Sequence, residues 1–301
     1  NNGAFTASTG TLTLDGTSAQ AISGATTFNN LVLSNASATT TASSPLTIAG
    51  NLTLSASGVT FAGGGNTITV KGGIANSGTH SGSGKILLSA GTATHALTGS
   101  GTYGNLEIDD TGFNATVTGT PTVSGTLTFI NGRISTVGTS DTLIIGAGGS
   151  ISGAATSRHV VGNLAKTYSA TGSFTYAVGD GTNYTPVLVN FTSLTTTGNL
   201  TVSTPASAGD HPNTTAGSSG VEYATSVNRY WTFSNWTLVG TCNVTLNYIT
   251  TDVDSGATAA SFVIRRGASC SGSGGLRTCT SWSGLTVSGT PTTTQASASG
   301  V

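Results

Sequence analysis

Two acidic motifs are the first places in this sequence where side chains of suitable type stand close enough to do chemistry. Asp252-x-Asp254-Ser-Gly256 has the first elements of an oxygen-ligand calcium loop. The later acidic ligand of such a loop is missing, because residues 255–301 contain neither Asp nor Glu. Asp followed by Gly is also typical of a turn whose carboxylates accept hydrogen bonds from backbone amides. We therefore favour a turn, with a calcium site at Asp252 and Asp254 as the alternative.

The second acidic motif is the adjacent pair Asp109-Asp110, since paired carboxylates are the catalytic groups of polysaccharide-cleaving enzymes. Thr-Gly-Phe follows the pair and predicts a turn instead. The histidines that could serve as bases are scattered without the spacing of a zinc site; they are His80, His95, His159 and His211. No nucleophile motif stands near them, so we expect no catalytic residues, no cofactor and no enzymatic activity.

Cysteine and tryptophan supply the remaining candidate site residues. Cys270 and Cys279 bracket the Gly/Ser-rich segment SGSGGLRT, and a disulfide between them is plausible in an oxidising compartment. Cys242 then remains, either as a buried thiol in a strand or in some other pairing. Trp236 and Trp282 are candidates for stacking on sugar rings, whereas Trp231 follows Tyr in a strand and is expected in the core.

A repeat in the sequence indicates which kind of structure positions these residues. GTSAQAISGATTFNNLVL at residues 16–33 returns as GTATHALTGSGTYGNLEI at residues 91–108, and the similarity extends without a gap. Residues 10–78 and 85–153 are therefore two copies of one unit, offset by 75 residues. A fixed period of this kind indicates a solenoid, propeller or array.

The repeat also gives each candidate residue of the second copy a counterpart in the first. Asp109 and Asp110 align with Ser34 and Asn35, which suit the same turn without charge. Glu107 aligns with Val32 and is expected on an outward strand face. His95 aligns with Gln20, which predicts a solvent-facing polar position.

Short strands punctuated by Gly and Asn fill both copies. NNLVL, GNLTL and NTITV alternate apolar and polar residues, the period of a strand with one buried face. No segment has the 3.6-residue period of an amphipathic helix. We predict an all-β chain whose residues 1–155 form a parallel, β-helix-like solenoid, with about three coils of ~25 residues in each copy.

The pattern changes near residue 155. The segment from Arg158 to Phe191 introduces aromatics and longer alternating strands, and VNRYWTF and CNVTLNYITTDVDSG follow later. Such strands are typical of antiparallel sheets packed face to face. We therefore predict a β-sandwich-like region over residues 156–301.

Three motifs carry a resemblance to a known class of proteins. The copies contain TFNNLVL…LTIAGNLTLSASGV and TYGNLEI…PTVSGTLTFINGRI, and residues 159–187 read HVVGNLAKTYSATGSFTYAVGDGTNYTPV. The third motif consists of aromatic, basic and acidic residues of the second region: Arg229, Tyr230, Trp231, Tyr248, Asp252, Asp254 and Trp282. Together they resemble modules of the large secreted adhesin-like surface proteins of bacteria, particularly Bacteroidetes. The resemblance implies surface structure and adhesion, without catalytic residues; Ala177 departs from it where those modules often have Pro.

Composition narrows the class of function. Only 6% of the 301 residues are charged, against about 25% in a typical globular protein, and the net charge is −1. No basic surface is available to neutralise phosphates, so we expect no nucleic acid partner, and no apolar run is long enough to span a bilayer. Since the sequence has no Met and residue 1 is Asn, we expect either a processed chain whose secretion signal has been removed or a segment of a longer protein.

These observations lead to one main hypothesis and its rivals. The main one is an extracellular structural protein at the cell surface that polymerises with itself, either through stacked solenoid ends or by donating a strand between copies. Residues 1–8 are the candidate donor and the segment ASGV, residues 298–301, marks the candidate acceptor region. The alternative is a monomeric adhesin module that binds glycans or surfaces. Ice binding through Thr-rich faces and polysaccharide cleavage rank below both.

Overall fold

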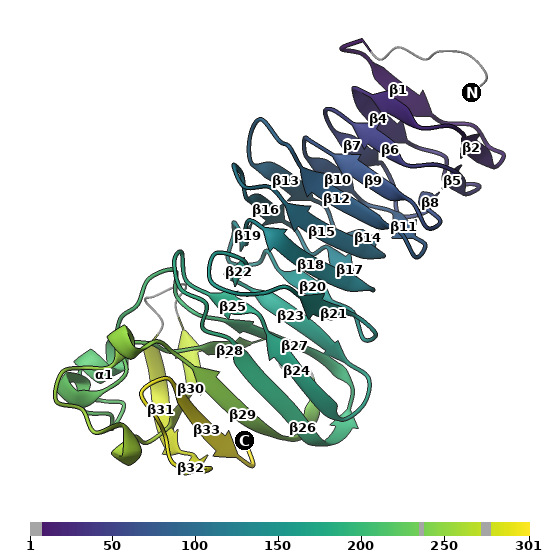
Figure 1. Ribbon diagram of the computed structural model, residues 1–301. Coiled ribbons are helices and arrows are strands. Elements are labelled where there is room, and N and C mark those ends of the chain that lie inside the picture. The colour runs from purple at the N-terminus through teal and green to yellow at the C-terminus, as the bar shows by residue number, and fades with distance from the viewer. Residues whose placement is uncertain (1–7, 235–237, 272–277) are drawn as a thin grey trace. The chain divides into compact units, whose positions relative to one another are not determined.

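A computed structural model describes residues 8–234, 238–271 and 278–301. The chain is almost entirely β-structure and divides after His159 into two compact units, close to the boundary expected at residue 155 (Figure 1). No helix among the described residues is long and apolar enough to cross a membrane.

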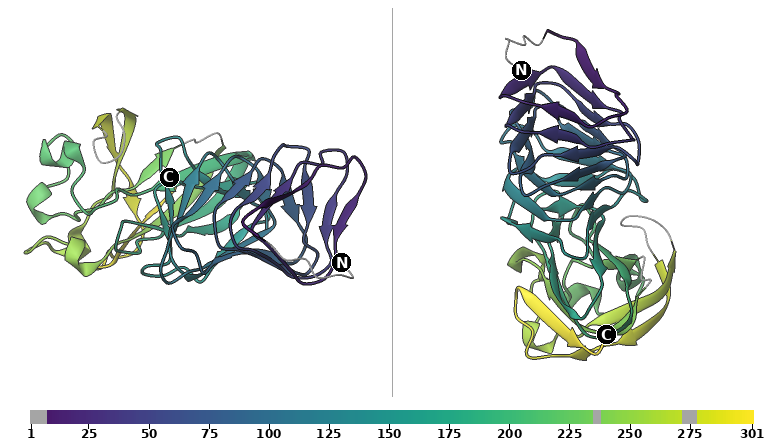
Figure 2. Two further views of the ribbon diagram at one scale, coloured as in Figure 1. Left: turned by 90° about the horizontal axis from the view of Figure 1, so that it is seen from above. Right: turned by 90° about the vertical axis from the view of Figure 1, so that its right-hand side faces the viewer.

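The first unit is a parallel β-solenoid whose coils each place one strand in each of three sheets (Figure 2). The first sheet runs in the order β1 (Thr11–Leu14), β4 (Asn30–Leu33), β7 (Leu52–Leu54), β10 (Ile74–Asn76), β13 (His95–Thr98), β16 (Ala115–Thr118) and β19 (Ile134–Thr136). The second contains β2 (Gln20–Ile22), β5 (Thr40–Ala42), β8 (Thr60–Ala62), β11 (Thr79–Ser81), β14 (Thr102–Tyr103), β17 (Thr122–Val123) and β20 (Leu143–Ile145). The third contains β3 (Thr26–Phe28), β6 (Leu46–Ile48), β9 (Thr67–Val70), β12 (Lys85–Ser89), β15 (Asn105–Asp109), β18 (Thr126–Asn131) and β21 (Ser150–Ser152).

The core of the solenoid consists of columns of aliphatic side chains, one residue from each coil. In the first sheet Leu31 pairs with Leu52, Leu52 with Ile74 and Ile74 with Leu97. These four side chains are fully or almost fully buried. No coil closes a core alone, since each apolar row is covered by the rows above and below it.

The coils are shorter than the sequence predicts. Leu31 and Leu52 are 21 residues apart and Leu52 and Ile74 are 22 apart, so a coil takes fewer than the expected ~25 residues. One 75-residue period leads from β2 to β13, eleven strands further along the chain. Since each coil contributes three strands, the period is two strands longer than three coils. Equivalent strands of the two copies therefore lie in different sheets: β4 belongs to the first sheet and its counterpart β15 to the third.

An asparagine at the first position of β4 and of β15 explains the Asn and Gly of the repeated motif. Asn30 Oδ1 accepts a hydrogen bond from the backbone N–H of Asn51 at 2.8 Å, and Asn105 Oδ1 accepts one from Thr126 at the same distance. A Cβ on Gly50 or Gly125 would overlap these side-chain oxygens. Each copy thus needs Asn in one coil and Gly in the next.

The second unit is built mainly from antiparallel strands. Its five-stranded sheet has the order β24 (Gly172–Tyr176), β26 (Val187–Thr196), β29 (Val239–Asn247), β33 (Gln295–Ser299) and β32 (Thr286–Val287). β23 (Leu164–Tyr168), β27 (Gly198–Ser203) and β28 (Thr232–Ser234) are consecutive in another sheet. The short strands β22 (Val160–Val161) and β25 (Val178–Gly179) pair in parallel, and β30 (Arg265–Ser271) with β31 (Thr278–Gly284) forms a separate hairpin.

Aromatic residues fill the space between the two antiparallel sheets. The rings of Tyr168 and Phe191 meet edge-on with centroids 4.7 Å apart, and Tyr176 Oη donates to the carbonyl oxygen of Leu200 at 3.0 Å. Helical segments are short: α1 (Pro212–Thr215) and the 3₁₀ turns η1 (Tyr223–Thr225), η2 (Thr250–Asp252) and η3 (Ala259–Ser261). The face-to-face antiparallel region that follows the solenoid matches the predicted fold class.

Candidate functional site

The second unit contains a cavity of about 970 Å³, which we call the aromatic cavity. Its floor comes from the inward-facing residues of two neighbouring strands, Val244 and Leu246 of β29 and Ala296 and Ala298 of β33. Ala296 pairs with Leu246 and Ala298 with Val244, and both alanines are buried. Because alanine side chains are short, this part of the sheet leaves space above it unfilled.

Aromatic side chains form another part of the cavity lining, which we call the aromatic wall. Tyr230 and Trp231 precede β28, Tyr248 follows β29, and Trp282 belongs to β31. Trp231 Nε1 donates to the carbonyl oxygen of Thr185 at 3.2 Å, which fixes its ring. Large apolar side chains with a few polar groups among them are the usual lining of a binding cavity.

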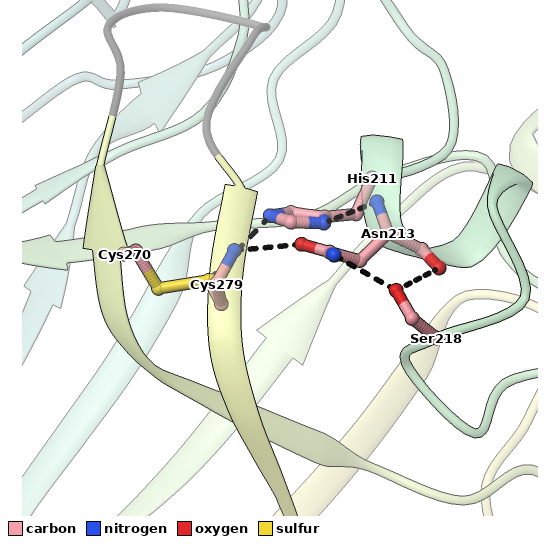
Figure 3. Close-up of a disulfide and its surroundings, with 5 residues drawn as sticks. All are labelled: His211, Asn213, Ser218, Cys270 and Cys279. Carbon is pink, nitrogen blue, oxygen red and sulfur yellow. Dashed lines mark hydrogen bonds between the residues drawn. A yellow bond between two sulfur atoms is a disulfide. The ribbon is translucent and has the colours of Figure 1, made fainter.

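A disulfide holds the hairpin that carries Trp282 (Figure 3). Cys270 and Cys279 lie opposite each other on β30 and β31 and are joined, as the sequence suggested. Asn213 Oδ1 accepts the backbone N–H of Cys279 at 2.7 Å, so the hairpin is tied to α1 as well. The third cysteine, Cys242, is a buried free thiol, and burial raises its pKa to about 11.

His211 joins α1 to the aromatic wall. Its Nδ1 accepts the backbone N–H of Asn213 at 3.1 Å, so the proton of the neutral ring is on Nε2, which lies 3.9 Å from Cys279 Sγ. The His211 ring meets Tyr230 and Trp282 edge-on, with centroids 4.7 and 5.0 Å away. Burial lowers the pKa of His211, in keeping with a neutral ring that packs against aromatic neighbours.

One buried arginine, Arg229, is among the residues that line the cavity. The Nε and Nη2 atoms of Arg229 donate to the carboxylate of Asp252 at 2.6 and 3.1 Å, and Nη2 also donates to Asp180 at 2.7 Å. Burial opposes the charge of Arg229, but the two carboxylates outweigh it and raise its pKa. Arg229 Nη1 is buried and has no hydrogen-bond partner among the described residues.

The same contacts place the calcium candidates. Asp252 is buried and its carboxylate is occupied by Arg229, itself a cation. Asp254 accepts the backbone N–H of Ser226 at 2.8 Å and the side-chain amide of Asn228 at 2.7 Å. The two carboxylates therefore serve separate structural contacts, and no cluster of three or more metal-ligating residues occurs in the described ranges.

The acidic pair of the solenoid is also divided between two environments. Asp109 accepts a hydrogen bond from Asn131 on the outer surface, whereas Asp110 is buried. His95 corrects the sequence prediction, since it is fully buried and not solvent-facing. Its Nε2 lies 3.1 Å from Asp110 Oδ2, which explains why a polar residue is tolerated there. Glu107 faces outward, as expected, and forms an ion pair with Lys85.

Of the two tryptophans proposed to contact sugars, Trp282 lines the aromatic cavity and Trp236 lies outside the described residues. Trp231, expected in the core, lines the cavity instead, and neither this position nor the floor alanines was predicted from the sequence. The only signal for the floor was the strand QASAS, whose inward positions carry nothing larger than Ala.

No family model, curated protein or solved structure matches the chain.

Proposed function

We propose that the chain is a non-catalytic structural subunit that assembles with copies of itself into an extracellular filament at the cell surface. The observation that carries the proposal is the first coil of the solenoid. Within the described residues β1 pairs only with β4, and Leu12 and Leu14 are partly exposed, whereas Leu31 and Leu33 one coil further are fully buried. Coils of this kind stack by parallel strand pairing, and the same pairing between a coil of one chain and a coil of another would extend the solenoid from copy to copy.

The surface of the solenoid supports the same proposal. Its outward strand positions are mostly Thr, Ser and Asn, and only 6% of the whole chain is charged. Stacked copies would therefore meet without rows of like charge, which destabilise neighbouring strands. The Cys270–Cys279 disulfide is consistent with an oxidising, extracellular setting.

Electron microscopy and size-exclusion chromatography of the purified protein test this function directly. We expect filaments of constant width for the wild-type chain. Leu12→Asp places a charge on the inward face of β1 and should abolish them, whereas Thr13→Asp, on the exposed face of the same strand, should not. A wild-type chain that stays monodisperse at 29.5 kDa under native conditions would refute self-assembly.

A second candidate function is a monomeric adhesin module that binds glycans. The aromatic cavity favours it, because the faces of Trp231 and Trp282 are the kind of surface on which sugar rings stack. Binding of the wild-type protein to a glycan array, lost in Trp282→Ala and in Trp236→Ala with folding intact, would support it. An array without any bound glycan would count against it.

A further inference from the structure

A pocket of about 450 Å³ lies near the end of the solenoid, where residues 110–114, 131–133 and 156–158 meet, and we call it the corner pocket. All of its lining residues belong to the first unit and to the described part of the chain. One aromatic and five neutral polar side chains line it: Phe113, Thr111, Asn114, Asn131, Thr156 and Ser157. Arg133 and Arg158 line it too, although the whole first unit contains only four Lys or Arg residues. The corner pocket therefore concentrates the positive charge of a sparsely charged unit.

The repeat shows that the fold does not require the larger of these side chains. The first copy has Ala38, Thr39, Ala56 and Gly58 where the second copy has Phe113, Asn114, Asn131 and Arg133. The corner of the first copy nevertheless forms in the same way, with Asn35 accepting two backbone N–H groups as Asp110 does. Because coils stack with small residues at these positions, a role in binding explains the larger ones.

A β-bulge, which the equivalent strands of the first copy lack, shapes the corner pocket. In the first copy β4 and β7 pair without a shift of register. In the second copy the register of β15 and β18 shifts after Ile108, and Asp109 then pairs with Asn131. The residue passed over, Ile130, is 41% exposed, and its carbonyl oxygen accepts a hydrogen bond from Arg158 Nη1 at 3.3 Å. Bulges redirect side chains and are common beside functional sites, and this one helps to hold both Asn131 and Arg158.

The charges of the corner pocket favour an anion. Asp110 is the acidic residue of its lining, and both carboxylate oxygens already accept backbone N–H groups, with His95 beside one of them. Arg158 donates to a backbone carbonyl oxygen and to no carboxylate among the described residues. The backbone N–H of Arg133 donates to Asn114 Oδ1 at 2.8 Å, so one lining residue fixes the backbone of another. Two guanidinium groups against one carboxylate leave the lining with a net positive charge.

We infer that the corner pocket binds a sugar residue that carries a carboxylate, a uronic or sialic acid of an acidic glycan. Arginine pairs with carboxylates through parallel hydrogen bonds, and Arg133 and Arg158 supply that contact. The neutral amide and hydroxyl side chains exchange hydrogen bonds with the sugar hydroxyls, and the Phe113 ring packs against an apolar face of the sugar. An acidic peptide offers the same carboxylate but fewer hydroxyl groups for these polar side chains.

The size and place of the corner pocket agree with this ligand. Small-molecule sites occupy about 300–1,000 Å³, and the corner pocket lies within that range. It belongs to the solenoid and differs from the aromatic cavity, which belongs to the second unit. The inference does not rest on self-assembly, because the site is complete within one copy of the chain.

Calorimetric titration of the full-length protein tests the inference. The probes are trigalacturonate, a hyaluronan tetrasaccharide and sialyllactose, each with its methyl ester as the uncharged control. We expect saturable binding of at least one acidic probe, and at least about tenfold weaker binding of its methyl ester, because the ester removes the charge that the arginines recognise.

Variants assign the binding to the corner pocket. Arg133→Gln and Arg158→Gln each remove one guanidinium group and should weaken binding of the acidic probe about tenfold or more. Arg133→Gly, which restores the residue of the first copy, should have the same effect while circular dichroism shows an unchanged fold. Lys71→Gln removes a positive charge of the same unit from outside the lining. Its affinity should stay within about twofold of the wild type, because salt screens distant charges.

Three results would overturn the inference. The first is that none of the acidic probes binds. The second is binding that the methyl esters match or that survives both arginine variants. The third is equal affinity for triglutamate, which carries carboxylates without sugar hydroxyls and would make the corner pocket a site for an acidic peptide instead.

Discussion

The two copies of the 75-residue unit solve one structural problem with different chemistry. In the first copy Asn35 is buried after β4, and its Oδ1 accepts the backbone N–H groups of Ser37 and Ala38, both at 3.0 Å. Asn35 Nδ2 reaches Gln20 Oε1 at 3.3 Å. A neutral amide therefore closes the corner and binds a neutral partner.

The second copy keeps the geometry and introduces charge. Asp110 Oδ1 accepts the backbone N–H groups of Gly112 and Phe113 at 2.9 and 3.0 Å, and Oδ2 faces His95. His95 Nδ1 lies 2.7 Å from the carbonyl oxygen of Gly72, so the ring is held between that carbonyl group and the Asp110 carboxylate. The comparison shows that this corner requires a side-chain oxygen that accepts hydrogen bonds from two backbone N–H groups. A charged side chain is not required, and only the second copy has one.

The added charge couples the second copy to pH. Burial opposes ionisation of Asp110, but the hydrogen bonds from Gly91, Gly112, His95 and Phe113 outweigh it and hold the pKa of Asp110 below its usual value. A carboxyl with a depressed pKa stabilises the fold above its unfolded pKa. That stability is lost as the pH falls through the folded pKa, and the corner of the first copy, closed by an amide, has no such dependence.

The largest effect is expected from Asp110→Ala. The substitution leaves His95 buried without its carboxylate and three backbone amides without an acceptor, so we expect a loss of about 3–5 kcal/mol. Asn35→Ala removes only neutral contacts and should cost about 1–3 kcal/mol. Urea denaturation followed by circular dichroism measures both, while tryptophan fluorescence serves as the control, because all three tryptophans lie in the second unit.

The double variant His95→Gln with Asp110→Asn gives the second copy the same residue pair as Gln20 and Asn35 of the first copy. If charge is an addition, this variant should unfold within about 1.5 kcal/mol of the wild type, since the amide oxygen still accepts from Gly112 and Phe113 and only the N–H of Gly91 loses its acceptor. A loss as large as that of Asp110→Ala would show that the two corners are not equivalent.

A buried histidine without a partner sharpens the contrast with His95. His80 lies in the sequence between the two copies and stacks in the column with Phe61, with ring centroids 5.9 Å apart. Neither of its nitrogens has a hydrogen-bond partner in the part of the chain that the structure describes. Burial lowers its pKa from 6.5 to about 4. A neutral buried His80 therefore stabilises the fold above pH 6.5, and we expect about 3 kcal/mol to be lost as the pH falls from 6.5 to 4.

His80→Phe should remove this acid sensitivity, because phenylalanine fits an apolar column and does not titrate. The unfolding midpoints of wild type and variant at pH 8 and at pH 4.5 make the comparison. An acid loss that is equally large in His80→Phe would assign it to other groups, Asp110 first among them.

Some features of this fold follow from the local sequence pattern, whereas others depend on how the coils stack on one another. Alternation in NNLVL or GNLTL predicts each strand and its inward face, since burial follows a period of two. Alternation does not predict how many residues make up one coil. The sequence therefore did not predict that β15 lies in a different sheet from its counterpart β4. His95 was misplaced for a related reason: alignment with Gln20 gives polarity, but not the partner 15 residues ahead that makes burial of a polar side chain possible.

The aromatic cavity was beyond prediction for a different reason. Its lining joins residues from Asp210 to Val301 through antiparallel pairing and the disulfide, and no short motif encodes those distances. Sequence patterns did identify Trp282 and the Cys270–Cys279 pair, because residue type alone restricts what they do. Cavities form where small side chains meet across a sheet, and Ala296 and Ala298 look unremarkable until their partners Leu246 and Val244 are known.

The smallest effect distinguishes the surfaces of the two copies. Glu107 forms an ion pair with Lys85 of the preceding coil, where the first copy has Val32 and Gly10 at the equivalent positions. The Lys85 side chain is 36% exposed, so solvent screens the pair and Glu107→Val should change stability by less than about 1 kcal/mol. The same substitution in 0.5 M salt should have a still smaller effect, because added ions weaken the wild-type pair. A larger, salt-independent loss would mean that Glu107 contributes through packing of its side chain against the neighbouring coils, and the outer surfaces of the two copies would then differ in more than charge.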